Sequence, residues 1–285
     1  MALDQVRPRP EVDFTVEPTA DEVAFFRENG YLVVDRITTD EELDWLAELY
    51  ESIFDPANAG LGGAPIDRST EVGPDGQNLL LQAFFPEVHH PEVLRTAAHR
   101  NARRYAAALL QVDPDAISSW GHMIRKAPGG REAPWHQDEA YWDPEAEYHA
   151  LGCWLPLHEV TEEMGAMQFI PGSHKLGVLD HHAKGDPAMH LLTVDIDTST
   201  RVVCPLPKGG CTFHDKNTVH YTAPNQTDRP RLAFPTEFQV APRPRPAGTV
   251  PVWPWVDEWR SISGARAPGG YWADGTYVPF DAATA

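Results

Sequence analysis

Two different spacings of apolar residues follow one another along this chain, and the change falls near residue 116. In the first part, apolar positions recur every three or four residues, as on one face of a helix. Thr19 and Glu22 have the spacing of a helix capping box, and Thr39 and Glu42 repeat it. The first part is therefore predicted to be helix-rich. The predicted elements are helices over about 20–29, 40–54 and 91–110, with a buried strand over 31–34.

From residue 118 onward the pattern becomes short apolar runs separated by Pro and Gly turns. Short strands at this spacing are typical of an all-β sandwich or barrel. There is no alternation of strands and helices that would indicate a parallel sheet, and no internal repeat. The predicted strands cover 121–126, 150–157, 167–170, 201–206, 210–214, 218–222 and 231–240.

These patterns predict a mainly β protein with flanking helices, folded as a single domain over residues 1–285. Helical support is expected over about 1–115 and a β-barrel over about 116–240. The remaining residues, 241–285, are rich in Pro and Trp and are expected to fold back as a cover on the barrel. A Gly-rich stretch over 59–76 is predicted to be a surface loop.

The charge balance narrows the possible partners. The chain carries 23 Lys and Arg against 42 Asp and Glu, a formal net charge of −19. Such a protein would be repelled by nucleic acid and by anionic membrane surfaces. The first residues lack the apolar core of a signal peptide, and no run of about 18 apolar residues could span a membrane. We therefore expect a cytoplasmic protein with a small-molecule substrate; the sequence does not indicate its oligomeric state.

The chain has only three cysteines, Cys153, Cys204 and Cys211. Their number is odd and they form no C-x-x-C pair, so neither a disulfide framework nor a zinc ribbon is indicated. Cys204 and Cys211 could face each other across a turn, but reduced thiols packed in the core are the favoured interpretation.

Candidate chemistry begins with the H-x-D pattern of His136 and Asp138. Residues two apart on an extended segment project from the same face, so an imidazole and a carboxylate could take adjacent positions on one metal ion. A second histidine would complete the two-histidine, one-carboxylate set of non-haem Fe(II) oxygenases. By itself the pattern is weak, since about one such match is expected by chance among so many His and Asp residues.

The sequence segments around this pattern identify a protein family more specifically. It includes PWHQD at 134–138, GCWLPL at 152–157, MGAMQFIPGSH at 164–174, HYT at 220–222 and, near the start, FRENGYLVV at 26–34. In this order the segments resemble the phytanoyl-CoA dioxygenase family of Fe(II)- and 2-oxoglutarate-dependent oxygenases, over about residues 20–240. The resemblance implies a double-stranded β-helix (a jelly-roll or cupin-like barrel) and an oxygenase that uses Fe(II), 2-oxoglutarate and O2.

The resemblance also assigns roles to individual residues. By position, His136, Asp138 and His220 would be the iron ligands. Arg231 would pair with the far carboxylate of 2-oxoglutarate, and Thr222 would offer it a hydroxyl. Because Asp138 is present, the related halogenases, which lack this carboxylate, are disfavoured.

Further positions fall where the family lines its co-substrate pocket, namely Gln137, Trp154 and Met123. Arg229 competes with Arg231 for the carboxylate; the family offset favours Arg231, which also lies inside a predicted strand.

Other histidines and aromatic residues have plainer interpretations. His174 is expected to fix a loop by hydrogen bonding, and His214 to be polar structure at the end of a strand. The pairs 89–90 and 181–182 are expected to be solvated loop histidines. Trp135, Tyr141 and Trp142 flank the H-x-D pattern and could be either packing at the barrel mouth or substrate walls.

The substrate lies outside these motifs. A chain of charge −19 without a cluster of Lys and Arg is a poor host for polyanionic CoA. Acidic residues after the H-x-D pattern could line the mouth and attract a cation; they are Glu139, Asp143, Glu145, Glu147, Glu159, Glu162 and Glu163.

This charge makes a secondary metabolite of antibiotic biosynthesis, such as an aminoglycoside-type amino sugar, one candidate, with hydroxylation or oxidative deamination as the reaction. A solvated loop face remains the favoured interpretation of these carboxylates. A terpenoid or an acyl- or amino-acid-type substrate is the alternative. A cupin-like binding module without catalysis is the alternative of a different class.

Overall fold

The computed structural model of the chain describes residues 6–55, 73, 76, 78–185, 191–256 and 270–279. Most of the predicted loop over 59–76 lies outside these residues. Among the described helices, none is long and apolar enough to cross a membrane.

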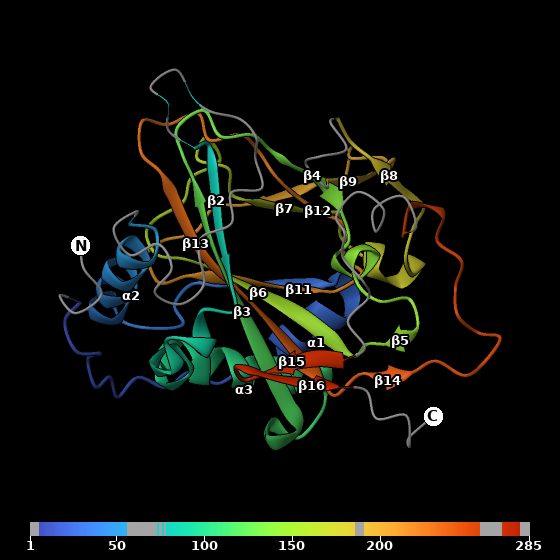
Figure 1. Cartoon of the computed structure of the whole chain (residues 1–285), viewed down its shortest axis with the longest axis horizontal. Coiled ribbons are helices and arrows are strands. Elements are labelled where there is room, and N and C mark those ends of the chain that lie inside the picture. Colours follow the sequence, from blue (N-terminus) through green and yellow to red (C-terminus); the bar gives the residue numbers. More distant parts are fainter. Residues whose placement is uncertain are drawn as a thin grey trace.

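The described residues of the first part of the chain contain three α-helices, which Figure 1 labels. Thr19 caps the first helix with its hydroxyl while Glu22 reaches back to the Thr19 backbone, so the predicted capping box is present. Thr39 caps the second helix. The helices are α1 (Ala20–Asn29), α2 (Asp40–Ile53) and α3 (Ala97–Leu110).

The third helix starts later than the sequence predicted. Residues Pro91–Arg95 form a 3-10 helix, and α3 begins only after Thr96, whose hydroxyl accepts from the amide of His99. The carboxylate of Glu42, on α2, accepts from two further amides in this first turn, at Ala97 (2.7 Å) and Ala98 (2.9 Å). Because these donors are satisfied from outside the helix, the break is a capped helix start rather than a kink.

The strands form two main sheets. The larger sheet has the order β1-β11-β6-β13-β3-β2, and the smaller has the order β10-β7-β12-β4, each antiparallel throughout. The larger sheet consists of β1 (Tyr31–Val34), β2 (Leu80–Phe84), β3 (Ile117–Lys126), β6 (Ala150–Pro156), β11 (Cys211–Asp215) and β13 (Arg231–Val240). The smaller sheet consists of β4 (Ala133–His136), β7 (Met167–Phe169), β10 (Val202–Cys204) and β12 (His220–Thr222).

Three two-stranded pairings complete the described strands. They are β5 (Ala146–Glu147) with β14 (Arg243–Pro244), β8 (His181–Ala183) with β9 (Leu192–Val194), and β15 (Gly270–Ala273) with β16 (Thr276–Pro279). All the predicted strands are present; the strands that were not predicted are β2, β4, β5, β8, β9, β14, β15 and β16. No described strand of one main sheet pairs with a strand of the other, so the arrangement is a sandwich of two sheets rather than a closed barrel.

Alternation along the strands separates two cores. On β13, Leu232, Phe234 and Phe238 face α2 and α3 and belong to the larger core. Ala233, on the opposite face, packs with Trp154 in the core between the two sheets. Successive side chains on a strand point to opposite faces, so Arg231 also points between the sheets.

The C-terminal part contacts the rest of the chain at several places, including the pairing of β14 with β5 and the two contacts that follow. Trp255 packs on Ala140 and donates its indole N–H to the carbonyl of Ala140, beside the predicted metal ligands. The β15–β16 turn reaches β3, where the carboxylate of Asp274 accepts from the amide and the hydroxyl of Ser119 (2.9 Å each).

The three cysteines are free and buried in the structure, which agrees with packed thiols.

Candidate active site

Three side chains with metal-ligand chemistry meet between the sheets. His136 ends β4, His220 begins β12, and the two are partners in the β4–β12 register. Asp138 opens the 3-10 helix Asp138–Tyr141 directly after β4. The ligand atoms of the three residues all lie within 4.8 Å of one another. The H-x-D spacing and the later histidine therefore come together in space.

The hydrogen bonds of the two histidines fix their tautomers. Nδ1 of His136 lies 2.6 Å from the carbonyl oxygen of Pro134, and Nδ1 of His220 lies 2.9 Å from that of Thr218. A carbonyl can only accept, so each Nδ1 carries the proton and each Nε2 keeps a free lone pair. Burial lowers the pKa of both imidazoles, which favours the neutral form that binds metal.

The carboxylate of Asp138 is held ionised. Burial alone would raise its pKa, but His220, then the hydrogen bond from His214 and the charge of His136 outweigh burial, and the pKa lies well below its usual value. Its Oδ1 lies 3.5 Å from Nε2 of His220 and 3.9 Å from Nε2 of His136. Two neutral imidazoles and one carboxylate with converging lone pairs are a donor set that fits Fe(II).

His214, on β11, contacts this set from the larger sheet. Its Nε2 lies 3.0 Å from Oδ2 of Asp138 and donates to it, which leaves Oδ1 as the oxygen that faces the two other histidines. The sequence interpretation of His214 as polar structure at a strand end was incomplete, because its hydrogen bond reaches a predicted ligand. No sequence signal reveals this contact, which joins residues 76 apart.

A second cluster holds two buried cations. Lys126 and Arg231 are opposite each other in the β3–β13 register, and their exposed fractions are 3% and 2%. Lys126 donates to the hydroxyl of Thr222 (2.9 Å) and the carbonyl of Ala223 (3.0 Å), and Arg231 donates to the carbonyl of Gly165 (2.7 Å). Nε of Arg231 is enclosed and has no hydrogen-bond partner among the described residues.

The electrostatics of this cluster favour the binding of an anion. Burial, and then the charge of Arg231, lower the pKa of Lys126 well below its usual value, and burial lowers the pKa of Arg231 to about 10. Neither cation forms an ion pair with a carboxylate in the described part of the chain. Two buried cations side by side are costly unless an anion joins them. The arrangement is suited to bind a carboxylate.

The structure places the other sequence candidates for this cluster as follows. Trp154 lies against Arg231, with the guanidinium carbon 5.2 Å from the ring centroid. Arg229 is exposed, so the geometry favours Arg231 over it. Lys126 was not singled out from the sequence, although it stands in the predicted strand 121–126, because nothing local marks it as facing Arg231.

Two of the predicted pocket residues point elsewhere. Gln137 is fully buried, and its amide group donates to the carbonyls of Gly177 and Asn217 and accepts from the amide of Leu179. It lies between two ligands along an extended segment, so its side chain takes the opposite face. The described hydrogen bonds of the Gln137 side chain are thus with loop residues, and its place at the co-substrate pocket stays a prediction.

Met123, the other residue predicted at this pocket, lies on the opposite face of the sheet from the two buried cations. It is fully buried in the core between the larger sheet and the helices. It is an odd number of residues from Lys126 on β3, so the two side chains point to opposite faces of the sheet.

The remaining histidines differ in burial, and not all of them match the predictions. His181 is buried, donates from Nδ1 to the carbonyl of Leu179 and accepts at Nε2 from the amide of Gln137, so its prediction as a solvated residue is wrong. His182 and His89 are exposed, as predicted. Nε2 of His174 lies 3.2 Å from the carbonyl of Arg27, which agrees with a loop-fixing role.

The aromatic residues beside the ligands pack on rings of the site. Tyr141 meets the ring of His136 edge-on at 5.7 Å, and Trp135 stacks on Tyr221 at 5.0 Å. Trp142 packs on Tyr148 with ring centroids 4.8 Å apart.

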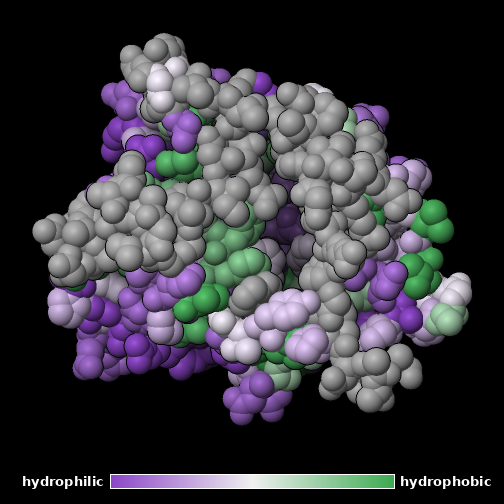
Figure 2. Space-filling view, viewed as in Figure 1, coloured by the Kyte–Doolittle hydropathy of each residue, from purple (hydrophilic) through white to green (hydrophobic). Residues whose placement is uncertain are grey.

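The acidic residues after Asp138 are less available than the sequence suggested. Glu139 is buried and forms ion pairs with Lys216 and Arg245, so its charge is neutralised inside the protein. Asp143 is buried and accepts from the amide of Glu145. Glu145 and Glu147 are exposed. Figure 2 shows a hollow near the middle of this face of the molecule, with hydrophilic side chains at its floor.

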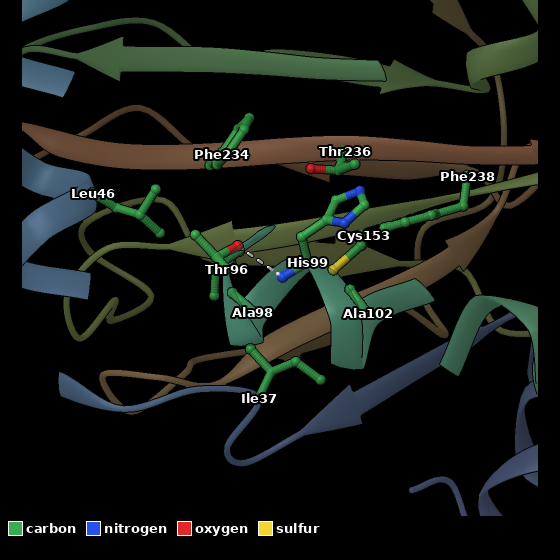
Figure 3. Close-up of a pocket in the computed structure, with 11 residues that line it drawn as sticks. Ile37, Leu46, Thr96, Ala98, His99, Ala102, Cys153, Phe234, Thr236 and Phe238 are labelled. Carbon is green, nitrogen blue, oxygen red and sulfur yellow. Dashed lines mark hydrogen bonds between the residues drawn. The ribbon is translucent and has the colours of Figure 1, made fainter. Parts of the chain in front are cut away.

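A separate small cavity lies on the other face of the larger sheet. Its lining includes Leu46 from α2, His99 from α3 and Phe238 from β13, as Figure 3 shows. The titratable ring in its lining, His99, is hydrogen bonded through Nε2 to the hydroxyl of Ser119 (2.8 Å). The sheet separates this cavity from the candidate metal centre, so we assign it to the core.

Comparisons with known proteins agree with this geometry. The sequence model of the phytanoyl-CoA dioxygenase family matches residues 26–233. "Phytanoyl-CoA dioxygenase domain-containing protein 1" of Danio rerio is 25% identical over 258 residues, covering 76% of this chain and 88% of that protein.

Two solved structures are similar in fold. EvdO2 from Micromonospora carbonacea var. aurantiaca, complexed with 2-oxoglutarate, is 33% identical, with a TM-score of 0.74 over 86% of this chain and 100% of that chain. The epimerase SnoN, in complex with Fe3+, alpha-ketoglutarate and nogalamycin RO, is 23% identical, with a TM-score of 0.61 over 80% and 86% of the two chains. The likeness confirms the predicted jelly-roll class.

Proposed function

The chain belongs to the phytanoyl-CoA dioxygenase family, and from this premise we propose that His136, Asp138 and His220 hold its Fe(II). Members of the family are Fe(II)- and 2-oxoglutarate-dependent dioxygenases that act on small molecules, and this chain is such an enzyme. The proposal is supported by the two fixed tautomers and by the single carboxylate oxygen turned toward them. Three protein ligands leave coordination positions for 2-oxoglutarate and O2.

The single observation that carries the proposal is the unpaired cation pair of Lys126 and Arg231. We propose that the far carboxylate of 2-oxoglutarate lies between them, with the Thr222 hydroxyl beside it. The guanidinium would bind it in a planar, bidentate way, held in place by the carbonyl of Gly165 and the ring of Trp154. The lysine, which now donates to Thr222, would supply the second charge.

When bound, Fe(II) supplies the activation of O2, which oxidises 2-oxoglutarate to succinate and CO2 while one C–H bond of the substrate becomes C–OH. The residues of this chain position and enclose the reactants. His136 and His220 keep their Nε2 lone pairs toward the centre because their Nδ1 protons are held by carbonyls. Asp138 stays ionised because His220 and His214 lower its pKa.

For the substrate we propose a small polar molecule of secondary metabolism, with an aminoglycoside-type amino sugar as the leading candidate. Hydroxylation at a carbon that bears an amine would release ammonia and leave a carbonyl group. Glu139 does not support this candidate, because Lys216 and Arg245 neutralise its charge. The support comes instead from polar groups inside the site. A terpenoid or an acyl- or amino-acid-type substrate is the alternative, and CoA is disfavoured by the charge of −19.

The experiment is anaerobic addition of Fe(II) and 2-oxoglutarate, followed by the visible charge-transfer band of the chelate. We expect the wild-type chain to show this band and His136→Ala to lack it. Arg231→Met and Lys126→Met should each raise the 2-oxoglutarate concentration that gives half of the full band by about tenfold or more. Each variant removes a charged hydrogen-bond donor.

Two matched controls are Arg229→Met, two residues from Arg231, and His182→Ala, both at exposed positions. They should behave as the wild type does. Absence of the band in the wild type, or equal effects of Arg229→Met and Arg231→Met, would contradict the proposed site.

A further inference from the structure

One row of side chains crosses the larger sheet on the face that looks between the sheets. The strand register aligns Trp120 on β3 with Glu237 on β13, Glu237 with Gly152 on β6, and Gly152 with His214 on β11. Glu237 is an even number of residues from Arg231 on the same strand, so both side chains point between the sheets. The row therefore brings a carboxyl group and an indole to the same side as the candidate metal centre.

Glu237 is a carboxyl group whose position has no structural explanation. Its exposed fraction is 9%, and Oε2 is enclosed without a hydrogen-bond partner among the residues described. No ion pair of Glu237 with Lys or Arg is present there either. Burial, followed by the nearby charges of Asp138 and Cys153, raises the pKa of Glu237 well above its usual value. A buried polar atom with no partner destabilises a fold, and so points to a ligand or a catalytic role.

Gly152 leaves room for its two neighbours in this row. A Cβ at Gly152 would lie 2.7 Å from the His214 ring, closer than real side chains approach, and 3.1 Å from Oε1 of Glu237. His214 in turn donates to Asp138. Glu237 and His214 therefore lie on either side of Gly152, and His214 contacts the candidate metal centre.

The two ends of the site differ in chemistry, since one holds two cationic groups and the other a carboxyl group whose raised pKa favours its neutral form. Arg231 and Lys126 lie at one end of β13, and Glu237 is six residues further along the strand, about 20 Å at the usual rise. The ligand His220 is two residues from Thr222, which contacts Lys126, while the ligand Asp138 contacts His214 in the row of Glu237. The candidate metal centre therefore lies between a cationic end and an acidic end.

The cationic end suits the co-substrate, which leaves the acidic end for the substrate. We propose that Glu237 is the substrate-recognition residue, and that its carboxyl accepts a hydrogen bond from an amine or hydroxyl group on a saturated ring that packs against Trp120. This inference rests on the proposed function and specifies it. Trp120 is partly exposed and lies next to Glu237 in the row. An aromatic wall with one convergent polar group is the usual form of a small-molecule site, and an aminocyclitol or a sugar matches it.

The test uses the full chain loaded with Fe(II) and 2-oxoglutarate and measures succinate released above the rate without substrate. The probes are 2-deoxystreptamine, methyl glucopyranoside, a monoterpene alcohol and an acyl-CoA. We expect one of the first two to stimulate the wild type, and the better one tells whether an ammonium or a hydroxyl group is recognised. Glu237→Gln should raise the probe concentration that gives half of the full stimulation at least tenfold. The 2-oxoglutarate concentration that gives half of the anaerobic band should stay within twofold of the wild-type value.

A second variant separates recognition from structure. Glu237→Leu should abolish stimulation and keep or raise the melting temperature, because it replaces an unpartnered buried carboxyl by an apolar group of similar size. The matched control is Glu162→Gln, at an exposed acidic position, which should change neither readout.

The outcomes distinguish the two proposals. If the wild type lacks the anaerobic band, the proposed function fails. If the band is present, this inference alone is overturned by any of three results: stimulation only by the terpene alcohol or the acyl-CoA, no stimulation by any probe, or equal stimulation of the wild type and Glu237→Gln. A melting temperature of Glu237→Leu below that of the control would also overturn it, since the carboxyl would then be structural.

Discussion

The two oxygens of Asp138 have different partners, and this division organises the centre. Oδ2 accepts from His214 at 3.0 Å, whereas Oδ1 is the oxygen nearer to His136 and His220. A carboxylate with one oxygen occupied has a fixed rotation and offers a single ligand atom. Such hydrogen bonds behind metal ligands commonly matter almost as much as the ligands themselves.

We therefore expect His214→Phe to weaken metal binding by about tenfold to a hundredfold, because the ring volume is kept while the hydrogen-bond donor to Asp138 is lost. The measurement is competition for Co(II) or Fe(II) against a chelating dye. His182→Phe, at an exposed histidine, is the control. Equal affinities of the two variants would show that His214 does not position the carboxylate.

At the scale of single residues, the candidate ligand types were predictable because H-x-D and the later histidine are part of the sequence. Gln137 and Met123 were assigned to the co-substrate pocket by their distance from a motif alone. Strand alternation reverses the face with every residue, so a neighbour of a ligand on an extended segment points away from it. The structure places Gln137 in a loop-tying role and Met123 in the helix-side core.

At the scale of the elements, hydrogen bonds from α3 to the carboxylate of Glu42 on α2 connect the two helices, in addition to apolar packing. Glu42 is fully buried and accepts from the amides of Ala97 and Ala98 and from the hydroxyl of Thr38. The negative charge also lies at the positive end of the α3 dipole. This contact fixes where α3 begins, which the sequence placed six residues too early.

Glu42→Gln should lower the free energy of unfolding by about 2 kcal/mol, since it removes charge-assisted hydrogen bonds to buried amides and brings an NH2 group toward N–H donors. Chemical denaturation followed by circular dichroism measures the loss. Glu41→Gln, the exposed neighbour, should cost much less. An equal loss in both variants would contradict the assigned cap.

The strands of the larger sheet were predictable as elements, but their pairing was not. Lys126 and Arg231 are cross-strand partners 105 positions apart in the chain, and the register of β3 against β13 depends on the whole sheet. A shift of one residue would turn Arg231 to the helix side and break the cluster. The proposed co-substrate site therefore depends on the whole sheet rather than on either strand alone.

At the scale of the whole molecule, stability depends on pH through buried carboxyl groups, and Glu87 is one of them. Glu87 accepts from the amide of Gly121 and lies against the β15–β16 turn at Gly275. Burial, opposed in part by backbone hydrogen bonds, raises its pKa to about 7. The folded chain therefore binds this proton more tightly than the unfolded chain does.

Because the folded chain binds this proton more tightly, the free energy of unfolding falls as the pH rises. Below pH 4.5 the contribution of Glu87 is fully present, and it is lost as the pH rises through about 7, by up to about 3 kcal/mol. Glu87→Gln should flatten the fall in unfolding free energy over this range and be the more stable form at pH 8. The measurement is urea denaturation from pH 5 to 8, with the exposed Glu145→Gln as control. A parallel fall in wild type and Glu87→Gln would rule out Glu87 as the cause.

The sequence by itself determined the helix and strand periods, the mainly β class and the order of the candidate ligands, because each of these depends on residues close together in the chain. It also determined the family, through motifs whose residue types are required by the chemistry. Only the tertiary structure decided which distant side chains meet: His214 with Asp138 across 76 positions, Lys126 with Thr222 across 96, and Glu237 beside Gly152. The physical reason is that sheet register and the facing of two sheets are set by the packing of the whole chain, and each side chain's face changes with a single step of that register.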